Sequence, residues 1–563
     1  MIRNHHRFDM KAWLAKAPIR ITALTDSSAL SRQRVRRTDW VILGLLVLLA
    51  CVVRLIFYTG PMGSDDVIYT QMAVAILHGD WSVGNYVGAL RYGINLPVAA
   101  LMALFGTSEF NANLWALLCA LGEVATVFVL ARSLWGRSAA ILAALVLALL
   151  PLHVNTSGRL LADTPLTFFT TLCFALFFYA ERGRSRALYL AAGLALGAVY
   201  WIKESVAVLI LPVFLVYALA IYTFRREWIW TMAGALAMLA LNLELMWWIS
   251  GDPWLVFRAT SGSVHKLDTR TDAQTSPAYY FRYLFLDGRH TWLMPFLTVG
   301  GIWAWWRSKP VRDGNTGYIV LWALGLLLIL SFAVVSFSPF RFIPKQTNYM
   351  QIFAAPFSLL AGYWLASRLR RRWAVAAMLL LVAGSLLLSA MEQQGIRVFV
   401  ANSRAALAFQ AAHPDVPVYG SVQAENLSSM LSALDGNWPS RPAIRPLTEA
   451  SNGRVFATTS GGPAEEMRPA AYAIVDLETL SWGNTGEARV SDVPACWRQK
   501  EVLVPQGFGF GREVLRILRN LAAIVMPEGL ARKASQATDP YYAPRPATVY
   551  EIPTACALRP QVS

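Results

Sequence analysis

The chain has 563 residues, of which 56% are hydrophobic and only 15% are charged, whereas roughly 25% of the residues in soluble domains are charged. This composition, with a mean hydropathy of +0.43, excludes a soluble enzyme. The net charge of +16 does not indicate nucleic-acid binding. The basic residues stand mainly in the N-terminal segment and in short links between apolar segments, as the positive-inside rule predicts for a membrane protein.

The N-terminal segment 1–39 is basic and lacks a signal-peptide cleavage pattern, so the apolar segment 40–58 is interpreted as a retained first span. Its one charge, Arg54, is expected to extend toward the membrane surface. The stretch 93–105 is too short to cross and is predicted to be re-entrant or interfacial. About 11 helical spans are predicted in all: 40–58, 110–131, 138–156, 163–181, 187–202, 205–223, 228–249, 290–306, 316–336, 344–366 and 373–390.

Every second link between these spans is basic, which predicts that those links and the N-terminus are cytoplasmic. The residues that carry this charge pattern are Arg132, Arg137, Arg182, Arg184, Arg186, Arg225, Arg226, Arg307, Lys309, Arg312, Arg368, Arg370, Arg371 and Arg372. An odd number of spans then places everything after residue 390 on the other side of the membrane.

The outward segments include two long loops, 59–109 and 250–289, and three short polar pieces, 153–163, 203–204 and 337–345. After residue 390 the composition becomes that of a soluble domain. Residues 416–422, 471–476 and 548–552 are rich in β-branched and aromatic residues and are predicted strands, and 424–434 is a predicted helix. The predicted fold class is therefore an α-helical polytopic membrane domain, 40–390, followed by a small extracytoplasmic α/β domain, 391–563.

Five cysteines occur, and Cys496 and Cys556 are the two in the C-terminal domain. An even pair outside the cytoplasm is compatible with a disulfide. Two unpaired thiols are the alternative.

Two adjacent carboxylates, Asp65 and Asp66, follow the first span by a few residues, with Ser64 as the expected N-cap of a helix that contains Tyr69. They could simply complement the helix dipole. Alternatively, one acts as a general base toward an acceptor hydroxyl or amine. Neighbours in a helix point about 100° apart, so the two carboxylates need not share a role.

Further charged residues are expected on the outer side. Asp163 opens the fourth span and Arg159 precedes it, while Lys203 and Glu204 separate the fifth and sixth spans. Ordinary helix-start chemistry and a buried ion pair are the simple interpretations. The alternative is anion binding, to which Arg341 and Lys345 would also contribute, because cations on the outer side run against the charge bias. His153 is expected to be a hydrogen-bonded structural residue. No zinc-protease, phosphate-loop or serine-elbow motif occurs.

The order of these features resembles the GT-C glycosyltransferases, and within them the bacterial branch related to protein O-mannosyltransferases and to the aminoarabinose lipid A transferase. The resemblance covers roughly 40–370. It rests on Asp65-Asp66 with Tyr69, on Leu104-Phe105-Gly106, on 130–136, on Arg159 with 163–169, and on 193–203. Asp66 stands where the family usually has glutamate, so a role that needs the longer side chain, such as metal contact, is not implied.

The resemblance implies sugar transfer from a polyprenyl-phosphate donor to an envelope lipid, glycan or protein, at the outer face of a bacterial cytoplasmic membrane. Asp65, with Asp66, would be the catalytic pair. The implied donor-binding residues are Tyr69, Arg159, Asp163, Lys203, Glu204, Arg341 and Lys345. No cofactor follows from the sequence, and the involvement of a divalent metal ion is left open. A transporter or lipid flippase is the main alternative, and a scaffold for envelope assembly is another. The absence of an internal repeat disfavours a transporter.

Overall fold

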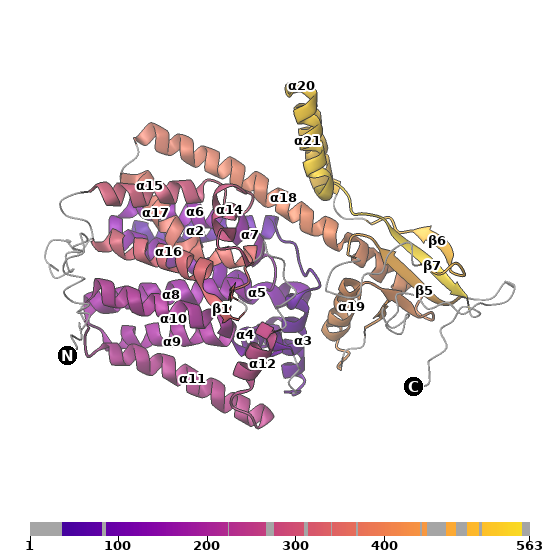
Figure 1. Cartoon of the computed structure of the whole chain (residues 1–563), viewed down its shortest axis with the longest axis horizontal. Coiled ribbons are helices and arrows are strands. Elements are labelled where there is room, and N and C mark those ends of the chain that lie inside the picture. The colour runs from indigo at the N-terminus through magenta and orange to yellow at the C-terminus, as the bar shows by residue number, and fades with distance from the viewer. Residues whose placement is uncertain are drawn as a thin grey trace, which may run out of the picture.

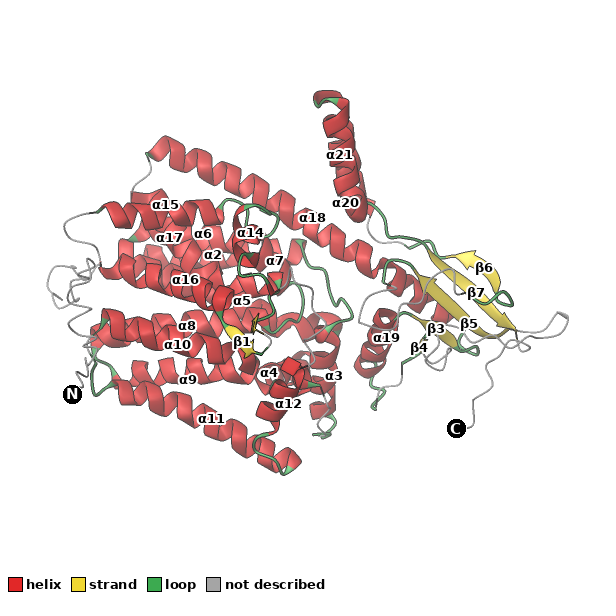
Figure 2. Cartoon of the chain, viewed as in Figure 1, coloured by secondary structure: helices red, strands yellow, loops and turns green. Residues whose placement is uncertain are grey.

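The computed structural model of the chain describes residues 36–81, 86–222, 224–265, 275–308, 314–338, 340–367, 370–439, 442–447, 469–479, 493–505 and 509–553. A bundle of helices forms one part of the molecule. A smaller sheet with flanking helices lies beyond one end of the bundle, and a single long helix joins the two (Figures 1 and 2).

The bundle helices run side by side (Figure 1). They are α2 (Arg37–Ile56), α5 (Glu109–Trp135), α6 (Arg137–Leu149), α7 (Pro151–Ser157), α8 (Asp163–Gly183), α9 (Arg186–Ile202), α10 (Glu204–Ile221), α11 (Trp228–Ser250), α15 (Met294–Arg307), α16 (Gly314–Phe332), α17 (Ala354–Ser367) and α18 (Arg371–Ala412). Most are apolar on every side, so that one side packs in a shared core while leucine, valine and tryptophan remain exposed on the other. Such exposure is typical of helices that face lipid.

Among the described residues, five helices are long and apolar enough to cross a membrane, or six if α6 and α7, bent by 58°, form one broken span. These six fall on predicted spans. The helices α9, α10 and α16 are apolar but shorter, and α15 and α17 begin later than predicted. The prediction for 316–336 is wrong at its end, because 334–337 form a strand. The count of about 11 spans stays a prediction.

The predicted outer loops contain helices that cover the end of the bundle nearest the sheet (Figure 1). In the loops 59–109 and 250–289 these elements are α3 (Asp65–Leu77), η1 (Val87–Leu90), α4 (Tyr92–Phe105), α12 (Leu255–His265) and α14 (Tyr279–Phe285). The antiparallel strands β1 (Val334–Phe337) and β2 (Phe340–Phe342) lie around the predicted outer piece 337–345, and η3 (Thr347–Phe353) lies within the predicted span 344–366. The helix α4 is indeed short, at 14 residues.

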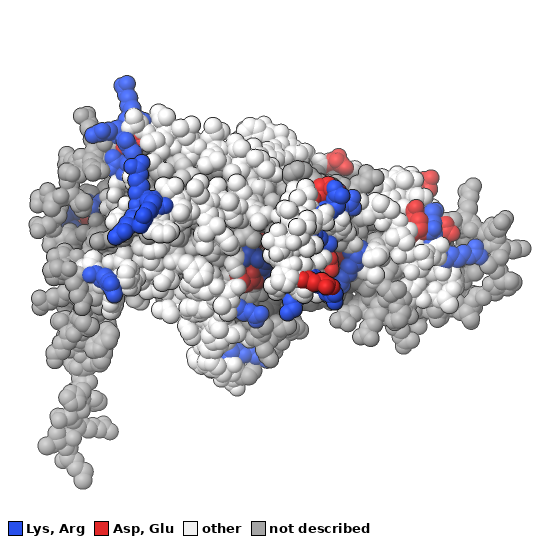
Figure 3. All heavy atoms as spheres, turned by 90° about the horizontal axis from the view of Figure 1, so that it is seen from above, with Lys and Arg blue, Asp and Glu red and all other residues white. Residues whose placement is uncertain are grey.

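The opposite end of the bundle carries the basic links. Glu181 pairs with Arg225 at 3.4 Å, and Asp39 pairs with Arg132 at 3.2 Å and with Arg137 at 2.7 Å, so the start of α2 lies at this same end. In Figure 3 the side chains of lysine and arginine at the left stand almost without acidic neighbours, whereas both signs mix toward the other end. The charge segregation predicted from the sequence is therefore present in the fold.

The helix α18 has 42 residues and continues well beyond residue 390. Its last turns contribute Ala406 and Phe409 to the core beneath the sheet. The sheet has the order β4 (Ile444–Pro446), β3 (Val418–Gly420), β5 (Pro469–Asp476), β7 (Ala547–Pro553) and β6 (Arg498–Val502). The strand β3 is parallel to β4 and β5, and β7 is antiparallel to β5 and β6. The helices α19 (Val422–Leu434), α20 (Gly509–Val525) and α21 (Glu528–Thr538) and the short η6 (Asp539–Tyr541) complete this part.

Arg54 does not extend to the membrane surface, and that expectation is wrong. Its side chain is 1% exposed and donates to the carbonyls of Ala50 at 2.9 Å and Ala148 at 3.1 Å. It also contacts His153, whose Nε2 lies 3.0 Å from Glu123. The residue is buried because these partners, on α5, α6 and α7, satisfy it inside the bundle. His153 is the hydrogen-bonded structural residue that was expected.

Candidate functional site

Asp66 is bound within the loop that precedes α3. Its carboxylate accepts hydrogen bonds from the backbone N–H groups of Met62, Ser64 at 2.6 Å and Val67 at 3.1 Å. Burial raises the pKa of Asp66, while these N–H groups and the charge of Arg159 oppose the shift. Ser64 is the N-cap residue as predicted, but its side chain makes no capping bond. Both oxygens of Asp66 are therefore occupied by the loop.

Asp65 differs from its neighbour because it is half-buried and keeps access to solvent. Its carboxylate accepts a hydrogen bond from the hydroxyl of Tyr86 at 2.7 Å. Burial, followed by the charge of Asp65, raises the pKa of Tyr86, so this phenol stays a proton donor to the carboxylate. Of the two acidic residues, Asp65 is the one whose carboxylate can meet an incoming group.

A buried chain of polar groups links α3 to α10. Arg91, just before α4, donates to the hydroxyl of Tyr69 at 2.6 Å and lies 3.5 Å from Glu204. Arg91 is 7% exposed, Glu204 5% and Tyr69 fully buried. Arg91 was not predicted as a site residue, although it is the one Lys or Arg in the predicted outer loop 59–109 and, like Lys203, a cation on the outer side.

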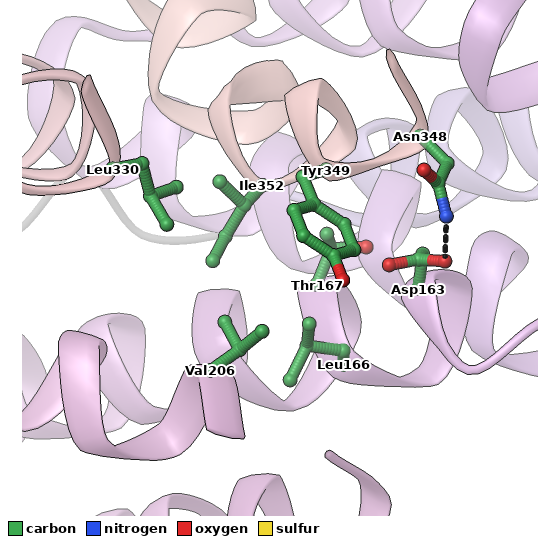
Figure 4. Close-up of a pocket in the computed structure, with 8 residues that line it drawn as sticks. All are labelled: Asp163, Leu166, Thr167, Val206, Leu330, Asn348, Tyr349 and Ile352. Atoms are coloured by element: carbon green, nitrogen blue, oxygen red, sulfur yellow. Dashed lines mark hydrogen bonds between the residues drawn. The ribbon is translucent and has the colours of Figure 1, made fainter. Parts of the chain in front are cut away.

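A second cluster lies where α8, α9 and η3 meet. The ammonium group of Lys203 donates to Asp163 at 2.8 Å, and Asn348 donates to the other oxygen of Asp163 at 2.7 Å. Lys203 also lies 4.1 Å from the centre of the Tyr349 ring, close enough for a cation–π contact. Figure 4 shows Asn348 and Tyr349 from η3 pointing toward Asp163. The pocket there is lined by Asp163, Leu166, Thr167, Val206, Leu330, Asn348, Tyr349 and Ile352.

The two clusters are adjacent because Lys203 and Glu204 are consecutive, at the break between α9 and α10. Lys203 has a backbone φ of −156°, which ends α9 before α10 begins. The break sends the Lys203 side chain to Asp163 and the Glu204 side chain to Arg91. The structure thus joins Asp65, Tyr69, Asp163, Lys203 and Glu204 in one region.

The remaining predicted cations are placed differently. Arg159 donates to the sulfur of Met62 at 3.1 Å, beside the Asp66 loop, and its buried Nε has no hydrogen-bond partner among the described residues. Lys345 is fully buried and donates to the backbone carbonyls of Ile343 at 3.0 Å and Thr275 at 3.3 Å. Arg341 is half-buried in β2. Arg159 therefore lies at the acidic loop, whereas the hydrogen bonds of Lys345 go to backbone carbonyls elsewhere.

We expect Tyr69→Phe to destabilise the protein by about 1.5–3 kcal/mol, the range for a hydrogen bond to a charged group. The substitution leaves buried Arg91 without its 2.6 Å partner. Tyr92→Phe is the matched control, because Tyr92 is equally buried and its hydroxyl has no hydrogen-bond partner in the described part of the chain. Thermal unfolding of both variants in the same detergent is the measurement. Equal losses would contradict the assigned role of the Tyr69 hydroxyl.

The helix α19 of the C-terminal part covers the acidic loop. Gln423 donates to the carbonyl of Met62 at 2.8 Å, and Asn426 donates to that of Gly63 at 3.0 Å. Gln71 on α3 donates to Ser429 at 2.6 Å. These bonds fix the carbonyls of the loop whose N–H groups hold Asp66, so α19 positions the motif that opens α3.

We expect Gly63→Ala to lower the stability of the protein more than Gly79→Ala does. Both glycines have a positive φ, +85° at Gly63 and +75° at Gly79, and an alanine in that region costs roughly 1–2 kcal/mol. A Cβ at Gly63 would also lie 2.8 Å from Cγ of Gln423, whereas one at Gly79 would meet nothing within 4 Å. This clash should add about 1–3 kcal/mol. Apparent melting temperatures in detergent test the order, and equal values would contradict the close fit of α19.

Two further predictions concern the C-terminal part and metal binding. Cys496 is half-buried and disulfide-bonded, while Cys556 lies outside the described residues, so the pairing of these two cysteines stays a prediction. In the ranges that the structure describes, no group of three His, Cys, Asp or Glu side chains is arranged to hold a metal ion.

Comparison with known proteins identifies the class of protein to which this chain is similar in sequence and fold. The model of the dolichyl-phosphate-mannose-protein mannosyltransferase family matches residues 94–247. The crystal structure of apo ArnT from Cupriavidus metallidurans superposes with a TM-score of 0.52 at 19% identity, covering 78% of this chain and 94% of that one. The protein therefore has an ArnT-like fold, and the resemblance to GT-C glycosyltransferases is confirmed.

Two curated relatives match the chain over a longer stretch than the family model does. The undecaprenyl phosphate-alpha-4-amino-4-deoxy-L-arabinose arabinosyl transferases of Pseudomonas aeruginosa strains UCBPP-PA14 and LESB58 are 30% and 29% identical over 351 residues. The matches cover 56% of this chain, and the chain spans only 58% of the length of these relatives.

Proposed function

We propose that this protein is an integral membrane glycosyltransferase that moves a sugar from a polyprenyl-phosphate donor to an envelope lipid, glycan or protein. The observation that carries the proposal is the half-buried carboxylate of Asp65, which interacts electrostatically with the buried cation Arg91, itself close to the buried Lys203, at one end of an ArnT-like bundle. Displacement of a phosphate leaving group needs a carboxylate that accepts the proton of the attacking group and cations that stabilise the departing phosphate.

In the proposed reaction, the acceptor hydroxyl or amine attacks the anomeric carbon of the donor sugar. Asp65 takes the proton of the attacking group as the new bond forms on the face opposite the phosphate. The bond between the anomeric carbon and the phosphate oxygen breaks, and polyprenyl phosphate leaves with the electron pair, so the configuration inverts. Asp66 acts alongside Asp65 by holding the loop that presents it.

The leaving phosphate is held by the outer cations. Lys203 uses one of its three N–H donors on Asp163, and Arg159 has a buried Nε without a partner among described residues, so both have donors to offer. Tyr69 and Glu204 orient Arg91, and Asp163 orients Lys203. Arg341 and Lys345 are proposed to contact the donor farther out, on the segment that leads to Asn348.

The proposed setting is a bacterial cytoplasmic membrane. The N-terminal segment 1–39 and the basic links would be cytoplasmic, and the domain 391–563 would be extracytoplasmic, with about 11 crossings between them. The donor lipid would enter from the membrane plane. The outer helix α12 packs through Val256 in one apolar cluster with Leu90 and Tyr92, which supports the proposal that the loop 250–289 covers the site.

The test uses the purified protein in proteoliposomes with a polyprenyl-phosphate donor that carries a radiolabelled sugar. We expect label to appear on an envelope acceptor and polyprenyl phosphate to be released in equal amount. Counterflow of labelled lipid or solute without any transfer would instead support the transporter or flippase alternative.

A further inference from the structure

The helix α20 has two chemically distinct faces. Val514, Ile517, Leu518, Leu521, Ile524 and Val525 recur at helical spacing along one side, and the opposite side carries Arg512, Arg516 and Arg519. Such a division predicts that one side is buried against an apolar phase.

The described chain covers only the beginning of this apolar face. Val514 and Leu518, at the start of this face, line a groove against α18, and Leu515, on the side of α20 turned toward α18, is 3% exposed. Farther along the apolar face Leu521 is 52%, Ile524 81% and Val525 78% exposed. Leu530 on α21 is also exposed. The outer half of the α20–α21 hairpin therefore presents a contiguous apolar strip with nothing in the described protein packed on it, which a soluble surface rarely tolerates.

The position of the hairpin identifies what covers the strip. A groove at its base is lined by Ile56 and Phe57 at the end of α2, by Leu387, Ala390 and Met391 of α18, and by Val514, Leu515 and Leu518 of α20. Gln393, Gln394 and Arg397 line the same groove. The base of α20 thus sits where α2 ends and where α18 changes from apolar to polar residues, which is the expected level of a membrane surface.

The direction and the charge of the hairpin also indicate that it lies at the membrane surface. In Figure 1, α20 and α21 project upward from α18, away from both the bundle and the sheet, instead of continuing along the bundle helices. Residues 509–538 contain five basic and two acidic side chains. A basic amphipathic helix that lies in the plane of a membrane surface has this combination of features.

We propose that the α20–α21 hairpin lies in the membrane interface, with Leu521, Ile524 and Val525 among the acyl chains and its basic side chains among anionic lipid headgroups. The hairpin would anchor the C-terminal part at a fixed height above the site. This inference depends on membrane insertion of α2 and α18 and not on the reaction proposed above.

The test uses the full-length protein in nanodiscs of phosphatidylethanolamine and phosphatidylglycerol, with an environment-sensitive fluorophore on Leu521→Cys. Ala523→Cys is the matched control, because Ala523 is exposed on the opposite face of the same turn. The parent protein, whose Cys51, Cys119 and Cys173 are free, gives the labelling blank. We expect a blue shift for the Leu521→Cys probe and loss of its fluorescence with spin-labelled lipids, and neither change for the Ala523→Cys probe.

Equal, water-like spectra at both positions in the bilayer would overturn the proposal. So would a blue shift at Leu521→Cys that is insensitive to spin-labelled lipid but is accompanied by energy transfer between differently labelled copies, because the strip would then be an interface with a second chain. Replacing phosphatidylglycerol by phosphatidylcholine should reduce the lipid quenching, and unchanged quenching would contradict the role assigned to the basic side chains.

Discussion

Replacement of Asp65 by asparagine is expected to lower the rate of sugar transfer by roughly 10²–10⁴-fold, the usual contribution of a general base. Asparagine keeps the size of the side chain and can still accept the hydrogen bond from Tyr86, which Asp65 accepts at 2.7 Å. It cannot take a proton from the acceptor. The variant should therefore fold and insert as the parent does, and only the transfer rate should fall.

Asp66→Asn should be measured beside Asp65→Asn, because it tests whether Asp66 holds the loop while Asp65 accepts the proton. Both oxygens of Asp66 accept hydrogen bonds from backbone N–H groups. In asparagine an NH₂ group replaces one oxygen, and this donor would stand opposite an N–H donor without an acceptor between them. We expect Asp66→Asn to lower both the melting temperature and the rate. An Asp65→Asn variant with full activity would contradict the assignment, as would an Asp66→Asn variant with unchanged stability.

Lys203→Met is the second change for which we expect a large effect. Asp163 is 3% exposed and, among the described residues, would keep Asn348 alone as a hydrogen-bond partner of its carboxylate. Leaving one member of a buried ion pair uncompensated costs about 3–5 kcal/mol. Transfer should also fall, because the leaving phosphate loses a cation. Thermal unfolding and initial rates at saturating acceptor are the two measurements.

The double variant Lys203→Met with Asp163→Leu separates the structural role from the proposed chemical one. Removing both charges leaves no unpaired ion, so stability should return toward that of the parent. The transfer rate should stay low, because the phosphate still lacks its cation. Recovery of both stability and rate in the double variant would mean that Lys203 only stabilises the fold.

The helical part of the fold could be predicted from the sequence because apolar length alone determines it. The predicted segments 110–131 and 163–181 coincide with α5 and α8. Arg54 was placed wrongly because its depth depends on Glu123 and His153, residues on other helices. The end of 316–336 was placed wrongly because a run of β-branched and aromatic residues suits either a span or the strand β1.

In the candidate site, too, features that depend on neighbouring residues could be predicted, whereas contacts between distant parts of the chain could not. The acidic pair is a local signal, and the roles of its two members follow from loop geometry that no periodicity encodes. The contacts of Arg91 with Glu204 and of Asn348 with Asp163 join residues 113 and 185 positions apart. Spacing along the chain therefore could not predict them, and Arg91, Asn348 and Tyr349 emerged only from the fold.

Sugar transfer that depends on Asp65 is tested most directly by mass spectrometry of envelope lipids, glycans and proteins from cells that produce either the parent protein or Asp65→Asn at equal levels. We expect one class of acceptor to carry an added sugar in the parent cells and to lack it in the Asp65→Asn cells. Identical envelope profiles in the two strains would contradict this expectation.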